Sequence, residues 1–347
     1  MTALDATRQS LRLAVASRIT PGATVAIVGP SGPMAHLTEG SLTYDVDAAA
    51  VGDDTLYDLA SLTKVLVTTS LLADLVSRRK LDLDHPVREL LPLWRQGPLS
   101  GVTPRHLLLH AAGLPAHLPL YRTHTGRDGY LAALDRLTPV APLNTQSLYS
   151  DLGFIALGLL IERVTGHSLA EAHQRWLLAS SLDPTTLTFM PDEALRPRVA
   201  PTEWDPWRQR LLVGEVHDEN AFALGGEAGH AGLFGTASAV GLVATWWLQR
   251  IIEGASWRHW VEPCDVPGSS RALGWDIMRP TSSCGPLFSS TSFGHTGFTG
   301  TSLWIDPVRQ TGVALLTNRV HPSRAGDRMQ PFRRRLHTAV AHDLRWS

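Results

Sequence analysis

The sequence predicts an α+β fold: an antiparallel sheet assembled from the two ends of the chain, with a helical subdomain inserted between them. Two observations lead to this prediction. Strand-like patterns occur near both ends of the 347-residue chain, and helical patterns fill its middle. Segments 1–80 and 220–347 are expected to form the sheet-containing part, and segment 81–219 a mostly helical subdomain. A cleft between the two parts is a natural ligand site.

The N-terminal elements follow from periodicity. Residues 5–19 predict a helix with Leu11, Val15 and Ile19 on one face. The stretches "ATVAIVG" and "PMAHLTEGSLTYD" predict two strands joined by the turn "PSGP". A further helix is expected to begin near Ser61.

The middle of the chain contains helical patterns such as "TPRHLLLHAAGL", "DGYLAALDRL" and "GFIALGLLIERVTGHSLAEAHQRWLL". A glycine-rich loop, "LGGEAGHAGLFGTAS", then leads into the predicted helix "AVGLVATWWLQRII". The chain returns to strands with "TSLWIDP" and "TGVALLTNR" and ends on an amphipathic helix.

Composition excludes several classes of function. The formal net charge is −1 and only 18% of residues are charged, so there is neither a nucleic-acid footprint nor a polybasic membrane anchor. We therefore expect a small-molecule substrate. A metal site is not expected, because His106 and His110 have helical spacing but the glutamate of a zinc-protease motif is missing.

The sequence favours a cytoplasmic location. The start, "MTALDATRQSLRLAVASRIT", lacks the apolar core of a secretion signal, and no apolar run is expected to reach the roughly 18 residues of a membrane span. Cys264 and Cys284 form no disulfide framework, which fits a reducing compartment.

Lysine usage draws attention to one position. Of the 31 basic residues, only Lys64 and Lys80 are lysines. A buried lysine can exchange protons, whereas arginine cannot. Ser61 lies three residues before Lys64, one helical turn away, so the amine can contact the hydroxyl and help to activate it. The pattern is also compatible with Ser61 as a simple N-cap.

Two later motifs favour catalysis. "SLYSDLGF" supplies Tyr149 and Asp151 before a helical run, and "FGHTGFTGTSLWIDP" supplies His295, Thr296 and Gly297 at the start of a predicted strand. In this order the motifs resemble those of the serine β-lactamase and penicillin-binding-protein superfamily, in particular class C β-lactamases, related D,D-peptidases and family VIII esterases. The resemblance covers roughly residues 20–320.

The resemblance implies an α/β sandwich with a helical lobe and an acyl-enzyme mechanism without metal or cofactor. Ser61 would be the nucleophile, Lys64 its proton partner, and Tyr149 the group that exchanges a proton with the leaving group. The backbone N–H groups of Ser61 and Phe298 would form the oxyanion hole. A nearby lysine cation is expected to lower the pKa of Tyr149. Which of Lys64 and Tyr149 first accepts the serine proton stays open.

Two departures from the superfamily pattern bear on the substrate. Asp151 stands where many members have asparagine, and His295 where many have lysine; Thr296 and Gly297 complete that motif. An ionised Asp151 offers only acceptors and would repel a carboxylate, although it would hold Lys64 as a cation. His295 is expected to be only partly charged near neutrality. Together the changes favour neutral esters or amides.

Three functions are therefore compared. The leading prediction is a carboxylesterase acting on small esters, with some action on β-lactams. The second is a D,D-carboxypeptidase, a muropeptide amidase or a class C-like β-lactamase. The third is a catalytically silent binding or sensor module, against which the intact Ser61, Lys64 and Tyr149 argue. The sequence does not predict the oligomeric state.

Overall fold

The computed structural model describes residues 4–326 and 328–346. Its main feature is a six-stranded antiparallel sheet with the strand order β2-β1-β11-β10-β9-β8. The strands are β1 (Gly22–Gly29), β2 (Gly32–Gly40), β8 (Asp276–Ile277), β9 (Phe293–Thr296), β10 (Ser302–Asp306) and β11 (Thr311–Thr317). Because β1 pairs with β11, the two ends of the chain meet in the middle of this sheet, as the sequence predicted.

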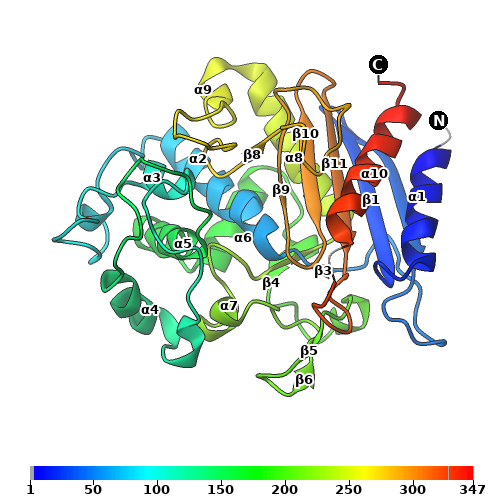
Figure 1. Cartoon of the computed structure of the whole chain (residues 1–347), viewed down its shortest axis with the longest axis horizontal. Helices are drawn as coiled ribbons and strands as arrows, with labels where there is room; N and C mark the ends of the chain where they lie inside the picture. The colour runs from blue at the N-terminus through cyan, green and yellow to red at the C-terminus, as the bar shows by residue number, and fades with distance from the viewer. Residues whose placement is uncertain (1–3, 327, 347) are drawn as a thin grey trace.

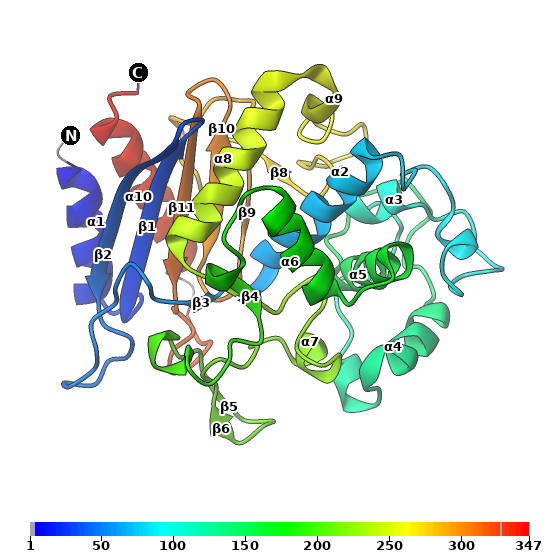
Figure 2. The ribbon, with the colours of Figure 1, turned by 180° about the vertical axis from the view of Figure 1, so that it is seen from behind.

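Helices cover both faces of the sheet. The terminal helices α1 (Asp5–Ala16) and α10 (Met329–Asp343) lie side by side on one face (Figure 1), and α8 (Ala237–Glu253) crosses the other face (Figure 2). Alternate residues of β1 pack into the cores on the two faces of the sheet, because successive strand side chains point to opposite faces. Val25 and Ile27 belong to the core beneath α1 and α10, whereas Ala26 and Val28 belong to the core beneath α8.

The rest of the chain packs beyond α8. The remaining helices are α2 (Ser70–Ser77), α3 (Pro104–Leu108), α4 (Gly126–Asp135), α5 (Asp151–Thr165), α6 (Leu169–Ala179), α7 (Glu219–Ala223) and α9 (Ala255–Arg258). Short strands form two small sheets: β3 (Tyr57–Asp58), β7 (Leu233–Gly235) and β4 (Leu187–Phe189) in one, β5 (Trp204–Asp205) and β6 (Arg210–Leu211) in the other. Segment 81–219 thus contains helices, irregular loops and short strands, more mixed than the pattern predicted.

Three predicted elements differ from the observed ones. The first helix ends at Ala16 rather than at residue 19, and Arg18 follows with φ +52°, a left-handed conformation that ends a helix. The second strand ends at Gly40 rather than at residue 45. The His-Thr-Gly motif lies where β9 ends, at Thr296, rather than at the start of a strand.

The segment around Ser61 is more varied than one helix. A one-turn 3-10 helix, Ala60–Leu62, is followed by a π-helical segment, Lys64–Thr69, and then by α2. The expectation that no apolar run reaches about 18 residues is wrong: among the described residues, the run from Ala60 to Ser77 is apolar and long enough to cross a membrane. The helices α5 and α6, bent by 69°, are long and apolar enough only when taken together. Most of the run is buried inside the protein, so it is a core element here.

Candidate active site

Ser61 is positioned by a constrained turn. Ala60 has φ +48°, which is uncommon for a residue with a side chain, and its N–H donates to the buried Asp58 carboxylate at 2.8 Å. The same carboxylate accepts the His217 N–H at 2.7 Å. Ser61 then lies inside the 3-10 turn rather than at an N-cap, so the alternative capping role is wrong.

Lys64 is the polar centre of the site. Its side chain is fully buried, and Nζ donates to Ser61 Oγ at 3.0 Å, to Asp151 Oδ1 at 2.8 Å and to the His230 carbonyl at 3.1 Å. These bonds use all three donors of an ammonium group. Burial by itself lowers the pKa of Lys64, but the Asp151 carboxylate and Tyr149 outweigh it, and the net pKa is raised. The resting lysine is therefore a cation.

Asp151 is the matching anion. Burial raises its pKa, but the Lys64 charge and the neighbouring His117 outweigh that effect and hold the pKa well below its usual range. His117 Nδ1 lies 3.8 Å from Asp151 Oδ2. The backbone N–H of Asp151 donates to the Ala116 carbonyl at 3.0 Å, which fixes the first residue of α5 beside the lysine.

Tyr149 is surrounded by cationic and aromatic side chains. Lys64 Nζ and Arg271 Cζ each lie 4.9 Å from the centre of its ring, and the His110 ring packs 4.6 Å away. The expected lowering of the Tyr149 pKa is wrong in its net direction: burial raises the pKa more than Lys64 lowers it. The resting site thus contains a phenol beside an ammonium.

His295 is neutral rather than partly charged. It is almost fully buried, and its Nδ1 lies 2.9 Å from the Thr296 carbonyl, which only accepts, so the proton is on Nδ1. Burial, Lys64 and Arg271 hold the pKa of His295 well below its ordinary value. Nε2, which has no described partner, is left as an acceptor.

The loop after β9 is tied to the segment before Ser61. A Cβ at Gly297 would lie 2.1 Å from Thr301 Oγ1 and 2.6 Å from the Leu59 carbonyl, so only glycine fits. Thr299 Oγ1 donates to the Asp58 carbonyl at 2.7 Å. These contacts bring Phe298 beside the turn that contains Ser61, and the Phe298 N–H donates to no described residue.

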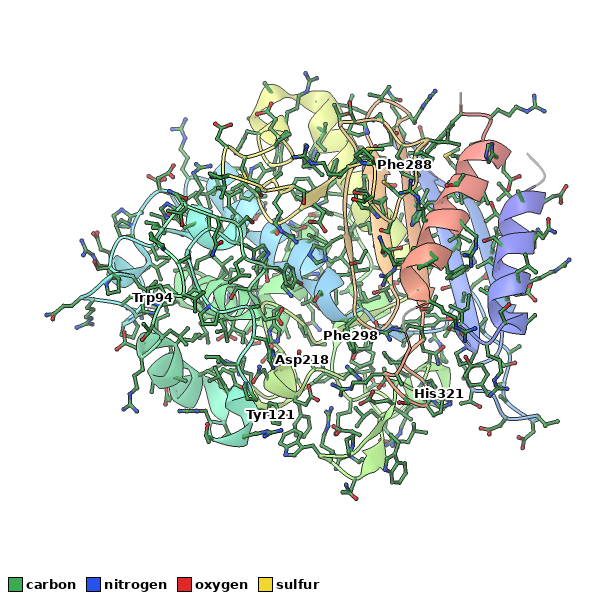
Figure 3. The ribbon with its side chains drawn as sticks, viewed as in Figure 1. Trp94, Tyr121, Asp218, Phe288, Phe298 and His321 are labelled. Carbon is green, nitrogen blue, oxygen red and sulfur yellow. The ribbon has the colours of Figure 1, made fainter. Side chains whose placement is uncertain are left out.

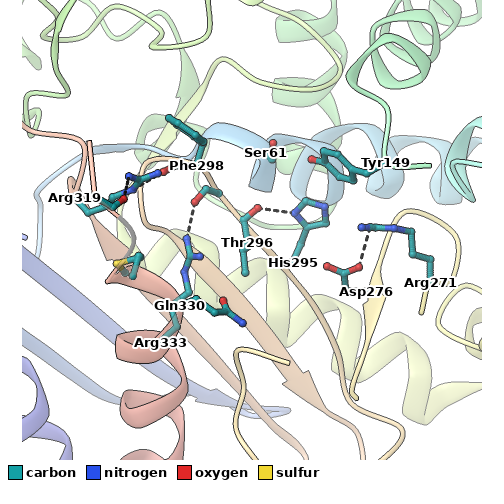
Figure 4. Close-up of a pocket in the computed structure, with 13 residues that line it drawn as sticks. Ser61, Tyr149, Arg271, Asp276, His295, Thr296, Phe298, Arg319, Gln330 and Arg333 are labelled. Carbon is teal, nitrogen blue, oxygen red and sulfur yellow. Dashed lines mark hydrogen bonds and ion pairs between the residues drawn. The ribbon is translucent and has the colours of Figure 1, made fainter. Parts of the chain in front are cut away.

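An open cavity of about 400 Å³ joins these groups (Figure 4). Ser61, Tyr149 and the whole stretch His295 to Phe298 line it, whereas Lys64 and Asp151 lie behind Ser61. Its lining also includes three arginines and one carboxylate that motif reasoning missed: Arg271, Arg319, Arg333 and Asp276. Arg271 Nη1 pairs with Asp276 Oδ1 at 2.9 Å. With His295 neutral, the described lining carries more positive than negative charge.

Comparison with known proteins identifies the family of the chain. The sequence model of the family described as "Beta-lactamase" matches residues 8–337. An N-acetylmuramyl-L-alanine amidase of Bacillus subtilis is 32% identical over 307 residues, which span 77% of this chain and 68% of the relative. A putative D-alanyl-D-alanine carboxypeptidase of Escherichia coli is 30% identical, spanning 80% and 72%.

Among solved structures, a penicillin-binding-protein homologue from Caulobacter crescentus superposes with a TM-score of 0.77 and 22% identity, over 98% of this chain and 97% of that one. The chain therefore belongs to the β-lactamase family and has the β-lactamase/transpeptidase fold. It is a serine hydrolase of the β-lactamase, D,D-peptidase and esterase type.

Proposed function

We propose that the chain hydrolyses an amide bond through an acyl-enzyme on Ser61, and that the leaving group is an amino acid or peptide bearing a carboxylate. Ser61 Oγ attacks the carbonyl, whose oxygen accepts hydrogen bonds from the backbone N–H groups of Ser61 and Phe298. One such donor stabilises the transition state by about 3 kcal/mol. In the form that reacts, the Lys64–Tyr149 pair has released one proton to solvent, so it can take up the serine proton, and it then returns one proton to the departing amine. Water then releases the acid by the reverse route.

The observation that carries this proposal is the position of Arg271. Its guanidinium lies against Tyr149, the proposed proton donor to the leaving group, and it lines the same cavity as Ser61. Asp276 is its one ion-pair partner among the described residues, so some of its five N–H donors face no carboxylate. A permanent cation at this place suits a leaving group that carries a carboxylate next to its amine.

Both curated relatives support this class, since one is named as an N-acetylmuramyl-L-alanine amidase and the other as a putative D-alanyl-D-alanine carboxypeptidase. We favour a muropeptide-type amide, such as N-acetylmuramyl-L-alanine, because the more similar relative is an amidase of that kind.

Hydrolysis of N-acetylmuramyl-L-alanine and of its carboxamide tests the proposal. The free acid should have the higher kcat/KM, and Arg271→Gln should remove roughly a tenfold advantage while leaving the carboxamide nearly unchanged. Arg279→Gln, at an exposed arginine outside the cavity, is the matched control. Equal rates for acid and carboxamide, or no amide hydrolysis at all, would contradict the proposal.

A small-ester carboxylesterase is the second candidate, and Asp151 favours it. The carboxylate behind Ser61 and the neutral His295 provide no attraction for an acidic substrate close to the nucleophile. Turnover of short aryl esters with no detectable turnover of either muramyl amide is the result expected from this candidate.

Tyr149→Phe separates proton donation from nucleophilic attack. An amine leaves as a neutral group only when it is protonated, whereas 4-nitrophenolate leaves without a proton. We expect the variant to lose roughly 10²- to 10⁴-fold in kcat on an amide and much less on a 4-nitrophenyl ester. Tyr121→Phe, at a tyrosine outside the catalytic cavity, is the control. Equal losses on both substrates would refute the leaving-group role.

A further inference from the structure

A second open cavity, of about 440 Å³, adjoins the catalytic one. Arg319, Gly326 and Met329 line both, so the two cavities meet along these residues. The second cavity lies beyond Phe298 at the same end of the six-stranded sheet, where Figure 3 labels Phe298 and His321. At this size it accommodates a ligand fragment rather than a single solvent molecule.

The second cavity is cationic. Arg18, Arg319 and Arg328 line it, and none of its described lining residues is acidic. Arg18 stacks its guanidinium 4.1 Å from the centre of the Tyr44 ring. Arg328 donates to the carbonyls of Ser17 and Arg18, each at 2.8 Å, which fixes the turn that presents Arg18.

Neither Arg18 nor Arg328 forms an ion pair with a carboxylate in the part of the chain that the structure describes. Asp45, which follows Tyr44 in the sequence, accepts a hydrogen bond from Thr43 Oγ1 at 2.7 Å and pairs with neither arginine in the described structure. The stacked, oriented Arg18 guanidinium therefore presents N–H donors without a matching anion. Guanidinium groups held in this way bind carboxylate and phosphate oxygens well.

The order of residues along the catalytic cavity indicates which part of a substrate extends to the second cavity. Tyr149 and Arg271 lie at one end of the catalytic cavity, and Phe298 and Arg319 at the other (Figure 4). Since Tyr149 protonates the leaving group in the proposed mechanism, the leaving group occupies its end. The acyl portion then extends past Phe298 and Arg319 towards Arg18.

We propose that this second cavity is an acyl-side subsite that binds an oxyanion, a carboxylate or a phosphate, at the far end of the acyl portion of the substrate. The inference rests on the proposed Ser61 acyl transfer and on the placing of Tyr149 beside the leaving group. It adds a second anion requirement, on the opposite side of the scissile bond from Arg271.

Activated esters test the subsite without requiring amide hydrolysis. The probes are 4-nitrophenyl monoesters of dicarboxylic acids of increasing length, the corresponding ω-phosphonoalkanoates, and neutral alkanoates of the same length. The wild type should prefer the anionic ester at one range of lengths, and the better of carboxylate and phosphonate identifies the anion. Arg18→Gln should reduce that preference roughly tenfold while leaving neutral esters unchanged, and Arg18→Lys should retain most of it.

Arg79→Gln is the matched control, because Arg79 is also an exposed arginine with positive φ, at the end of α2, outside both cavities. Hydrolysis of neutral esters with no anion preference at any length overturns the subsite alone. A preference that survives Arg18→Gln overturns it as well. Loss of all ester hydrolysis in the wild type would contradict the proposed function, and the subsite with it.

Discussion

Ser61→Ala is expected to lower kcat/KM by roughly 10⁴- to 10⁶-fold on both esters and amides, because it removes the proposed nucleophile and leaves only binding and the oxyanion donors. The fold should be retained. Lys64 loses one acceptor but keeps Asp151 and the His230 carbonyl, so the buried ammonium remains paired. Steady-state kinetics and thermal unfolding measure the two effects separately.

Ser77→Ala is the control for this variant. Its hydroxyl caps the exposed end of α2 by donating to the Asp74 carbonyl at 2.8 Å, far from any acyl chemistry. The control should keep wild-type kinetics. Activity of Ser61→Ala within about tenfold of wild type would assign the nucleophile to another residue.

Lys64→Arg is expected to reduce kcat by roughly 10²- to 10⁴-fold although it conserves the charge. The proposed cycle requires the Lys64–Tyr149 pair to accept and return a proton, and arginine does not release one in a protein. A guanidinium also cannot reproduce three bonds from one nitrogen to Ser61 Oγ, Asp151 Oδ1 and the His230 carbonyl.

The chain provides its own control, since Lys80 is the only other lysine and lies exposed after α2. Lys80→Arg should behave as wild type. Thermal unfolding of Lys64→Arg shows whether a loss of turnover comes from the lost proton transfer or from a destabilised fold. A folded Lys64→Arg enzyme with near-native turnover would refute the proton role of Lys64.

Much of the sheet was readable from sequence because its strands have strong local signals. The apolar runs of β10 and β11 and the amphipathic pattern of α10 lie where periodicity placed them. The turn at Ser61 was not readable in detail. At Ala60, which has positive φ, the N–H donates to the Asp58 carboxylate, and the His217 N–H, a tertiary contact that helix propensity does not predict, holds that carboxylate in place.

The catalytic cluster was predicted as three ordered motifs, and the structure brings Ser61, Lys64, Tyr149 and Asp151 together. The charges of the site were harder to predict. The neutrality of His295 and the raised pKa of Tyr149 follow from burial, which no single-sequence pattern measures. Arg271 lies in irregular chain far from every motif, so no local signal marked it as a cavity residue.

The covalent step is the central claim, and mass spectrometry of the quenched reaction tests it most directly. Wild-type protein mixed with an activated ester and acid-quenched within seconds should carry one added acyl mass, located by peptide mapping on the fragment that contains Ser61. Ser61→Ala treated in the same way should carry none. An adduct on a different residue, or one that persists in Ser61→Ala, would contradict the account.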